Sequence, residues 1–211
     1  MASSYQDLRS FQHCRKDVDL VCFLLPEYCP LCHQSTATTE SRIPPYVLPS
    51  PFCSSVNLKR SIVLKPTHGD FIRSYTRACN LHIGVTDETG QVYDFDEKGL
   101  NQRSVWSECL AVLTCNMGQA FVWDQTLDML SHQIHLWDNK RYHENQWNCF
   151  DFVLTFLSHL DHSDQIGPAP LSKEEFCENF LVKKTKKAEQ YIHLYRLASQ
   201  NGCVTVPKKP P

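Results

Sequence analysis

The sequence predicts an α+β protein in which an antiparallel sheet packs against helices and a small Cys-rich hairpin lies near the N-terminus. Three observations support this class. A strand-like alternation at residues 80–86 turns back at residues 87–91, an apolar helical stripe covers residues 148–160, and two cysteines enclose a Pro-Leu pair at residues 29–32. With 211 residues, 42% of them hydrophobic, the chain has enough apolar material for a substantial core.

The composition excludes several classes of protein. A formal net charge of −2 supplies no positive field for general nucleic-acid binding. No stretch approaches the roughly 20 apolar residues of a transmembrane helix, and residues 1–10 lack the order of a signal peptide. We therefore predict an intracellular, cytoplasmic protein without a transmembrane segment, with a nuclear location as the alternative. The 11 cysteines are odd in number and irregularly spaced, which favours reduced thiols.

Proline, serine and threonine divide the chain into segments. Residues 34–51 are rich in all three, which is typical of a linker. This linker separates an N-terminal unit, residues 1–33, from a folded body over residues 52–202. The last segment, residues 203–211, contains three prolines and two lysines, and we predict that it is a disordered tail.

The N-terminal unit contains a candidate metal site. An apolar run at residues 20–25 predicts a strand, and Cys29 and Cys32 follow it with the spacing of a zinc knuckle. His13 and Cys14 lie upstream of the strand and complete the predicted ligand set, although adjacent residues need unusual backbone geometry to share one ion. His33 is an alternative ligand. The pattern predicts structural zinc, with unliganded thiols as the alternative and no other cofactor.

The folded body contains a predicted β-hairpin. Apolar residues alternate with polar or small ones from Asn80 to Thr86, which is the period of a half-buried strand. Residues 87–90 have the composition of a turn, and residues 92–95 return as the second strand. A further strand is predicted over residues 109–115.

Several helical segments are predicted after these strands. Residues 119–136 carry a less regular apolar stripe, whereas residues 148–160 are apolar at i, i+3, i+4, i+7 and i+10. Asn148 is a good N-cap residue, which places Cys149 at the first helical position. Ser172 and Glu175 match a capping box, and a last helix near residues 186–199 ends before an Asn-Gly pair.

The helix that begins at Cys149 provides a candidate nucleophile. The first turn of a helix stabilises a thiolate through its backbone N–H groups and its dipole. His82 lies on the strand face opposite the apolar residues, and Asp94 has the matching parity on the returning strand. A tight hairpin brings Asp94 near His82. The three residues form a candidate Cys-His-Asp arrangement, in which the histidine is the base and the acid orients it.

Residues 142–153 have the form Y-x5-N-C-x-x-F-V and resemble the nucleophile segment of circularly permuted papain-like proteins. These include the lecithin retinol acyltransferase-like group and the deSUMOylating-isopeptidase (PPPDE) group. Residues 82–95 are similar to the histidine strand, glycine turn and second strand that precede that segment. The resemblance implies an NlpC/P60-type antiparallel sheet packed on helices. It further implies that Cys149 is the nucleophile, that Tyr142 donates a hydrogen bond to the oxyanion and that Asn148 belongs to the catalytic set.

Two positions depart from the patterns of these groups. Asp94 stands where the acyltransferase-like group has a second histidine, and Trp147 stands where the peptidase group has a histidine. An aspartate is still compatible with the orienting role. The tryptophan implies substrate contacts that differ from those of the peptidases.

Over most of its length the chain also resembles the makorin-2 opposite-strand protein family, a likeness that carries no activity with it. We predict a cysteine hydrolase or acyltransferase-like protein that acts on a peptide, an isopeptide or an acyl ester. A catalytically inactive papain-like interaction module is the first alternative. A protein that senses oxidants through its many thiols is the second. No oligomeric state is predicted.

Overall fold

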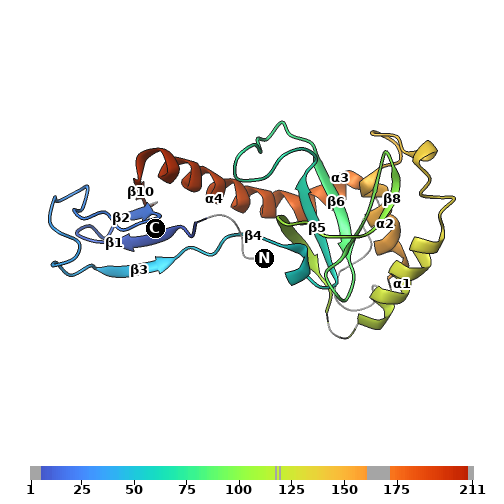
Figure 1. Cartoon of the computed structure of the whole chain (residues 1–211), viewed down its shortest axis with the longest axis horizontal. Coiled ribbons are helices and arrows are strands. Elements are labelled where there is room, and N and C mark those ends of the chain that lie inside the picture. Colours follow the sequence, from blue (N-terminus) through green and yellow to red (C-terminus); the bar gives the residue numbers. More distant parts are fainter. Residues whose placement is uncertain (1–5, 117, 119, 161–171, 209–211) are drawn as a thin grey trace. The chain divides into compact units, whose positions relative to one another are not determined.

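The structure is a computed structural model that describes residues 6–116, 118, 120–160 and 172–208. The chain forms two compact units (Figure 1). Unit 1 is Phe52–Ala188, and unit 2 combines Ala2–Pro51 with Glu189–Pro211. Each unit contains an antiparallel sheet, and helices accompany the sheets, so the predicted α+β class is confirmed.

Unit 1 is built on a six-stranded antiparallel sheet with the order β4-β9-β5-β6-β7-β8. Its strands are β4 Phe52–Cys53, β5 Ser61–Pro66, β6 Leu81–Thr86, β7 Val92–Asp96, β8 Gly99–Ser104 and β9 Cys109–Thr114. The central strands β5 and β6 are buried at nearly every position, so both of their faces are covered. This rigid centre carries the candidate histidine.

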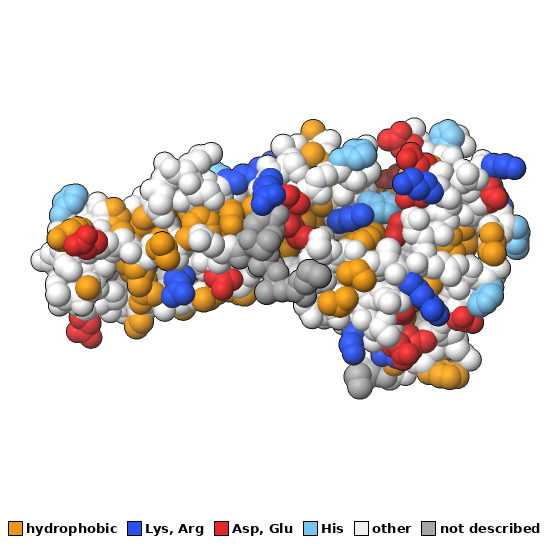
Figure 2. Space-filling view, viewed as in Figure 1, with side chains coloured by type: hydrophobic (Ala, Val, Ile, Leu, Met, Phe, Trp, Pro, Cys, Tyr) orange, Lys and Arg blue, Asp and Glu red, His pale blue; other side chains and the backbone are white. Residues whose placement is uncertain are grey.

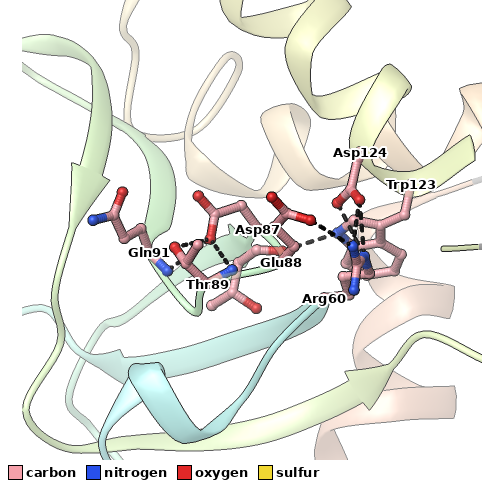
Figure 3. A network of polar contacts seen from close by, with 8 residues as sticks. Arg60, Asp87, Glu88, Thr89, Gln91, Trp123 and Asp124 are labelled. Atoms are coloured by element: carbon pink, nitrogen blue, oxygen red, sulfur yellow. Dashed lines mark hydrogen bonds and ion pairs between the residues drawn. The ribbon is translucent and has the colours of Figure 1, made fainter. Parts of the chain in front are cut away.

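The predicted hairpin and the predicted strand at residues 109–115 are confirmed as β6, β7 and β9. Asp87 shapes the turn between β6 and β7, because its Oδ1 atom accepts hydrogen bonds from the Thr89 and Gln91 backbone N–H groups (Figure 3). Gly90 completes the turn with a φ of 83°, a conformation that favours glycine. β8 was not predicted, because its polar sequence lacks an apolar alternation.

The helices of unit 1 begin close to the predicted positions. Among the residues that the structure describes they include α1 Ala120–His132, α2 Cys149–His159 and α3 Lys173–Phe176, with short turns η1 Ser55–Asn57, η3 Asn139–Arg141 and the π-helical η4 Cys177–Leu181. α2 packs against β6 and β7. Aromatic side chains fill the core: Trp123 meets Phe156 with ring centroids 4.7 Å apart, and Trp137 meets Phe152 at 5.0 Å.

A polar network fastens α1 to the β6–β7 hairpin (Figure 3). Arg60 donates from Nε and Nη2 to the carboxylate of Asp124 on α1, and from Nη2 to Glu88 in the hairpin turn. The indole of Trp123 donates to the backbone oxygen of Thr86 at 2.9 Å. These contacts fix the end of β6 that lies away from the candidate site.

Unit 2 contains a four-stranded sheet with the order β10-β2-β1-β3. The strands are β1 Arg9–Gln12, β2 Val18–Cys22, β3 Ile43–Val47 and β10 Cys203–Pro207, and α4 spans Val182–Asn201. The part of α4 that belongs to unit 2 packs on one sheet face, where Ala198 meets Leu8 and Val21. The predicted Cys-rich hairpin is present as β1 and β2.

The structure corrects two sequence predictions in unit 2. The segment predicted as a linker contains β3, which pairs with β1. Pro44 and Pro45 are tolerated there because β3 is an edge strand and has a side without ladder partners. The segment predicted as a disordered tail contains β10, which pairs along its length with β2. Residues 209–211 of that segment lie outside the described residues.

The two units present different surfaces. Figure 2 shows basic, acidic and histidine side chains close together on the visible face of unit 1, and apolar side chains gathered on that of unit 2. The exposed apolar side chains of unit 2 include Leu24, Tyr28 and Tyr46. Within the described ranges, no helix has the length and apolar character needed to cross a bilayer.

Candidate functional site

Cys149 is the first residue of α2, as its spacing from Asn148 predicts. The Asn148 side chain accepts a hydrogen bond from the Phe150 N–H at 2.9 Å, and the Asp151 carboxylate accepts one from the Asn148 N–H at 2.7 Å. This capping box fixes the start of the helix. The Cys149 N–H is therefore among the first-turn donors that an α-helix leaves without intrahelical partners.

His82 on β6 and Asp94 on β7 form a buried hydrogen bond. His82 Nε2 lies 2.8 Å from Asp94 Oδ2, and their exposed fractions are 8% and 4%. His82 also interacts with Cys149, and this interaction favours the charged form of the imidazole. The structure thus brings together all three residues of the arrangement predicted from the sequence.

The lack of a side chain at Gly84 permits this approach of β6 and β7. Gly84 has the same parity as His82, and a Cβ atom there would lie 2.7 Å from Val92 Cγ1 and 3.2 Å from Asp94 Cβ. Any larger residue would therefore force β7 away from β6. The packing of the two strands therefore explains why a glycine stands at position 84.

The Asp94 carboxylate is held from a second side by β8. Asn101 Nδ2 donates to Asp94 Oδ2 at 3.0 Å, and Ser104 Oγ donates to Asp94 Oδ1 at 3.4 Å. Sequence reasoning did not find Asn101 and Ser104, because β8 has no apolar pattern that would reveal which of its residues face inward. The register of β7 with β8, in which Asp94 opposes Asn101, is the signal that identifies Asn101.

The environment of His82 favours its charged form. Burial lowers the pKa of His82, but the hydrogen bonds to Asp94 and Cys149 and the charges of both residues outweigh burial and raise this pKa to about 9. The imidazole is therefore protonated at neutral pH. A cation beside a sulfur atom stabilises the thiolate, which is the nucleophilic form of cysteine.

The three residues lie in a cavity of about 1250 Å³ in unit 1. One wall carries Trp106, whose ring centroid is 5.6 Å from that of His82, and Lys65, whose Nζ atom lies 4.4 Å from the centroid of the Trp106 ring. The indole shields one side of the imidazole from water, and Lys65 adds a positive charge to the cavity wall. Trp106 is a further site residue that the sequence pattern did not indicate.

Tyr142 and Asn148 also line this cavity, but their surroundings differ. Burial raises the pKa of Tyr142, and the nearby charge of Cys149 raises it further, so its phenol keeps its proton. Its ring packs edge-on against Phe95. The Asn148 side chain is occupied in the capping of α2 and by a hydrogen bond to the Glu144 backbone oxygen, so its contacts position Cys149.

A second group of reactive side chains lies in unit 2, where the ligand atoms of His13, Cys14, Cys29 and Cys32 are all within 4.8 Å of one another. The Sγ atoms of Cys14 and Cys29 are 4.0 Å apart, and Cys32 Sγ is 3.2 Å from His13 Nδ1. The adjacent residues His13 and Cys14 thus both contribute, because they lie in a bend after β1. His33 is not part of this group.

The surroundings of this group suit a metal ion. His13 Nε2 is hydrogen-bonded to Thr39 Oγ1 at 2.6 Å, which leaves Nδ1 directed at the sulfur atoms. The Leu31 N–H points to Cys29 Sγ at 3.5 Å, and a hydrogen bond from the Gln34 backbone lowers the pKa of Cys32. A His and Cys group of this geometry can hold a metal.

Comparison with known proteins places these features in a family. A family model described as DUF4796 C-terminal matches residues 45–197. The MKRN2 opposite strand protein of Homo sapiens is 32% identical over 205 residues, which cover 95% of this chain and 90% of that protein. No solved structure matches the chain. The matched domain contains Cys149, His82, Asp94 and Tyr142, whereas the four candidate metal ligands precede it.

Proposed function

The chain belongs to the MKRN2 opposite strand protein family, and we propose that unit 1, which holds most of the matched family domain, is a cysteine hydrolase or acyltransferase of circularly permuted papain-like architecture. Its substrates are a peptide, an isopeptide or an acyl ester. One observation carries the proposal: a buried imidazole that binds a carboxylate through Nε2 lies in one cavity with a helix-start cysteine, which also favours its charged form. This combination supports a thiol nucleophile with an oriented base.

The first half of the reaction forms a thioester. The Cys149 thiolate attacks the acyl carbon, and the oxyanion that forms accepts hydrogen bonds from the Cys149 backbone N–H and the Tyr142 hydroxyl. The bond between the acyl carbon and the leaving nitrogen or oxygen then breaks. The leaving group takes the proton of the His82 imidazolium, which Asp94 keeps in orientation.

The second half releases the acyl group. Water or an acceptor hydroxyl enters the cavity and transfers its proton to the neutral His82 as its oxygen attacks the thioester carbon. The carbon–sulfur bond breaks, and the Cys149 thiolate and the His82 imidazolium are restored. Hydrolase and acyltransferase activities differ only in the nucleophile that performs this step.

The proposal is tested by the rate at which iodoacetamide alkylates each cysteine of the full chain at neutral pH, followed by peptide mass spectrometry. Cys177 is the matched internal control because it lines the same cavity but burial raises its pKa. We expect Cys149 to react at least about 10-fold faster than Cys177. We expect His82→Ala to remove that advantage without changing the rate at Cys177.

Turnover is tested separately with an activated acyl ester as the probe. We expect burst release of the leaving group from the wild-type chain, an acyl adduct on Cys149, and no adduct in Cys149→Ser. If Cys149 reacts no faster than Cys177, the thiol is a buried structural residue and the enzyme proposal is wrong. If Cys149 is reactive but no acyl adduct forms, unit 1 is a noncatalytic module with papain-like geometry.

We also propose that His13, Cys14, Cys29 and Cys32 bind structural zinc. A tetrahedral zinc ion with Zn–S distances of about 2.3 Å separates its ligand atoms by roughly 3.8 Å. The cluster has ligand atoms within 4.8 Å of one another, so small shifts suffice to bring them to this spacing. Three thiolates and one imidazole are a common zinc ligand set, and the ion would add stability to a small unit.

The zinc content of the purified full chain is measured by elemental mass spectrometry. We expect about one equivalent in the wild-type chain and its loss in Cys29→Ser and Cys32→Ser. His33→Gln is the matched control, since His33 lies close in sequence but outside the cluster. A folded chain without zinc, or zinc that persists in both cysteine variants, contradicts this proposal.

A further inference from the structure

Two cysteines from distant parts of the sequence face each other in the sheet of unit 2. Cys22 is the last residue of β2, Cys203 is the first residue of β10, and the antiparallel register places them directly opposite. Both are free thiols. Neither belongs to the cluster of candidate metal ligands, although Cys22 and Cys203 pack in the same apolar group as Cys29.

The hydrogen bonds between the strands determine which kind of pair they form. Antiparallel strands alternate hydrogen-bonded pairs with non-hydrogen-bonded pairs, whose side chains lie closer together. The Lys208 N–H donates to the Asp17 backbone oxygen at 2.8 Å, so these residues form a hydrogen-bonded pair. The two kinds of pair alternate along the strands, so the next pair, Pro207 with Val18, is not hydrogen-bonded. This agrees with the absence of an N–H group in proline. Cys22 and Cys203 are then also a non-hydrogen-bonded pair.

This kind of pair suits a covalent link between the two sulfur atoms. Non-hydrogen-bonded pairs have Cα atoms about 4.5 Å apart, which is at the short end of the range found in disulfides. Each thiol shifts the pKa of the other, which is lowered for Cys22 and raised for Cys203. Only rotation about the side-chain bonds is required for the sulfur atoms to meet, because the backbone distance is within the allowed range.

We propose that Cys22 and Cys203 are a redox-active pair that forms a cross-strand disulfide on exposure to a low-molecular-weight disulfide such as oxidised glutathione. Cys203 is partly exposed, whereas Cys22 is fully buried, so the reagent reaches Cys203 first. The disulfide covalently joins the last strand of the chain to the second. Because its Cα atoms are close, the bond is strained and readily reduced.

The exchange proceeds in two balanced steps. The partly exposed Cys203 sulfur attacks one sulfur of oxidised glutathione as its proton is lost, and the first glutathione leaves as a thiolate and takes up that proton. The Cys22 thiolate then attacks the Cys203 sulfur of the mixed disulfide, and the second glutathione leaves with the proton of Cys22. The protein loses two electrons and two protons, and one disulfide of the reagent becomes two thiols.

The pair is tested by treating the full chain with oxidised glutathione, blocking the remaining thiols, and digesting with trypsin and a glutamate-specific protease without reduction. Cleavage after Lys16 and Glu27 isolates Cys22 in peptide 17–27, apart from Cys14, Cys29 and Cys32. Cleavage after Arg196 and Lys208 isolates Cys203. We expect these two peptides to be linked, with a mass about 2 Da below their sum because two hydrogens are lost.

The same samples are compared in thermal unfolding. We expect the oxidised wild-type chain to melt at least about 3 °C above the reduced chain, and dithiothreitol to reverse the shift. Cys203→Ser is expected to show neither the linked peptides nor the shift. Cys53→Ser is the matched control, since Cys53 is a half-buried thiol of unit 1, and it is expected to behave as the wild type. The zinc content is expected to stay constant throughout.

Two outcomes overturn the proposal, and both are found in the wild-type peptide map without any variant. In the first, Cys203 remains a mixed disulfide with glutathione while Cys22 is still a free thiol. In the second, Cys29 and Cys32 are oxidised to each other before any link between Cys22 and Cys203 is detected. Either result means that the opposed cysteines are a packing feature of the sheet.

Discussion

At the residue scale, the Asp94 hydrogen bond is the largest contribution that favours the charged form of His82. Asp94 accepts the Nε2 hydrogen bond of His82, while Asn101 and Ser104 hold that carboxylate in place from β8. Burial alone would lower the pKa of His82, so the charged form exists at neutral pH because Asp94 and Cys149 favour it. The carboxylate therefore controls the proton that the proposed reaction uses.

Asp94→Asn is expected to lower the pKa of His82 from about 9, because it removes the carboxylate whose hydrogen bond is the largest contribution that raises this pKa. The measurement is a titration of the His82 ring protons by NMR, combined with the rate of Cys149 alkylation at neutral pH, which is expected to fall. Asp128→Asn is the matched control, because Asp128 contacts the exposed His132 outside the site. An unchanged His82 titration in Asp94→Asn would refute the role of the carboxylate.

The same histidine makes stability depend on pH. Its pKa in the folded chain, about 9, lies above the unfolded value of 6.5. The protonated form therefore stabilises the fold fully below about pH 6.5, and this contribution disappears as the pH rises through about 9. We expect the free energy of unfolding of the wild type, relative to His82→Gln, to decrease by roughly 3 kcal/mol between about pH 6 and pH 9.5. Urea unfolding at several pH values measures it, and a constant difference would contradict the raised pKa.

At the scale of the elements, the site depends on how closely β6 and β7 approach. We expect Gly84→Ala to destabilise unit 1 by about 1–3 kcal/mol, because the new methyl group would overlap Val92 and press on Asp94. The His82–Asp94 hydrogen bond should lengthen, and Cys149 alkylation should slow. Gly118→Ala is the matched control, since no atom of the described residues lies within 4 Å of a Cβ at Gly118. Equal reactivity of the two variants would show that strand spacing does not control the site.

Elements with a regular pattern could be predicted from the sequence, and polar or proline-rich ones could not. β6, β7 and α2 follow an alternation, a turn and an N-cap, and these local signals also placed His82, Asp94 and Cys149. β8 lacks such a signal because it is polar, so the support for Asp94 from Asn101 was not found. β3 contains two prolines, which local reasoning assigns to a loop, and only the sheet order shows that an edge strand accepts them.

At the scale of the whole molecule, the chain ends contribute to the same unit. Unit 2 joins residues before Pro51 with residues after Glu189, so its sheet depends on pairing between segments far apart in sequence. Such long-range pairing leaves no local pattern, which explains why residues 203–207 resembled a tail in the sequence. The candidate metal ligands all lie in unit 2, and the residues that position Cys149 all lie in unit 1.

This division predicts that metal removal affects one unit only. We expect a strong chelator to lower the melting temperature of unit 2 and to increase deuterium uptake in β1 and β2, because zinc binding contributes to the folding of small units. The alkylation rate of Cys149 is expected to stay within about 2-fold, since its base, its orienting acid and its helix cap belong to unit 1. Cys29→Ser is expected to reproduce the chelator effect without any chelator. A large fall in Cys149 reactivity in both cases would mean that the metal cluster supports the thiol site, and that the two units do not act independently.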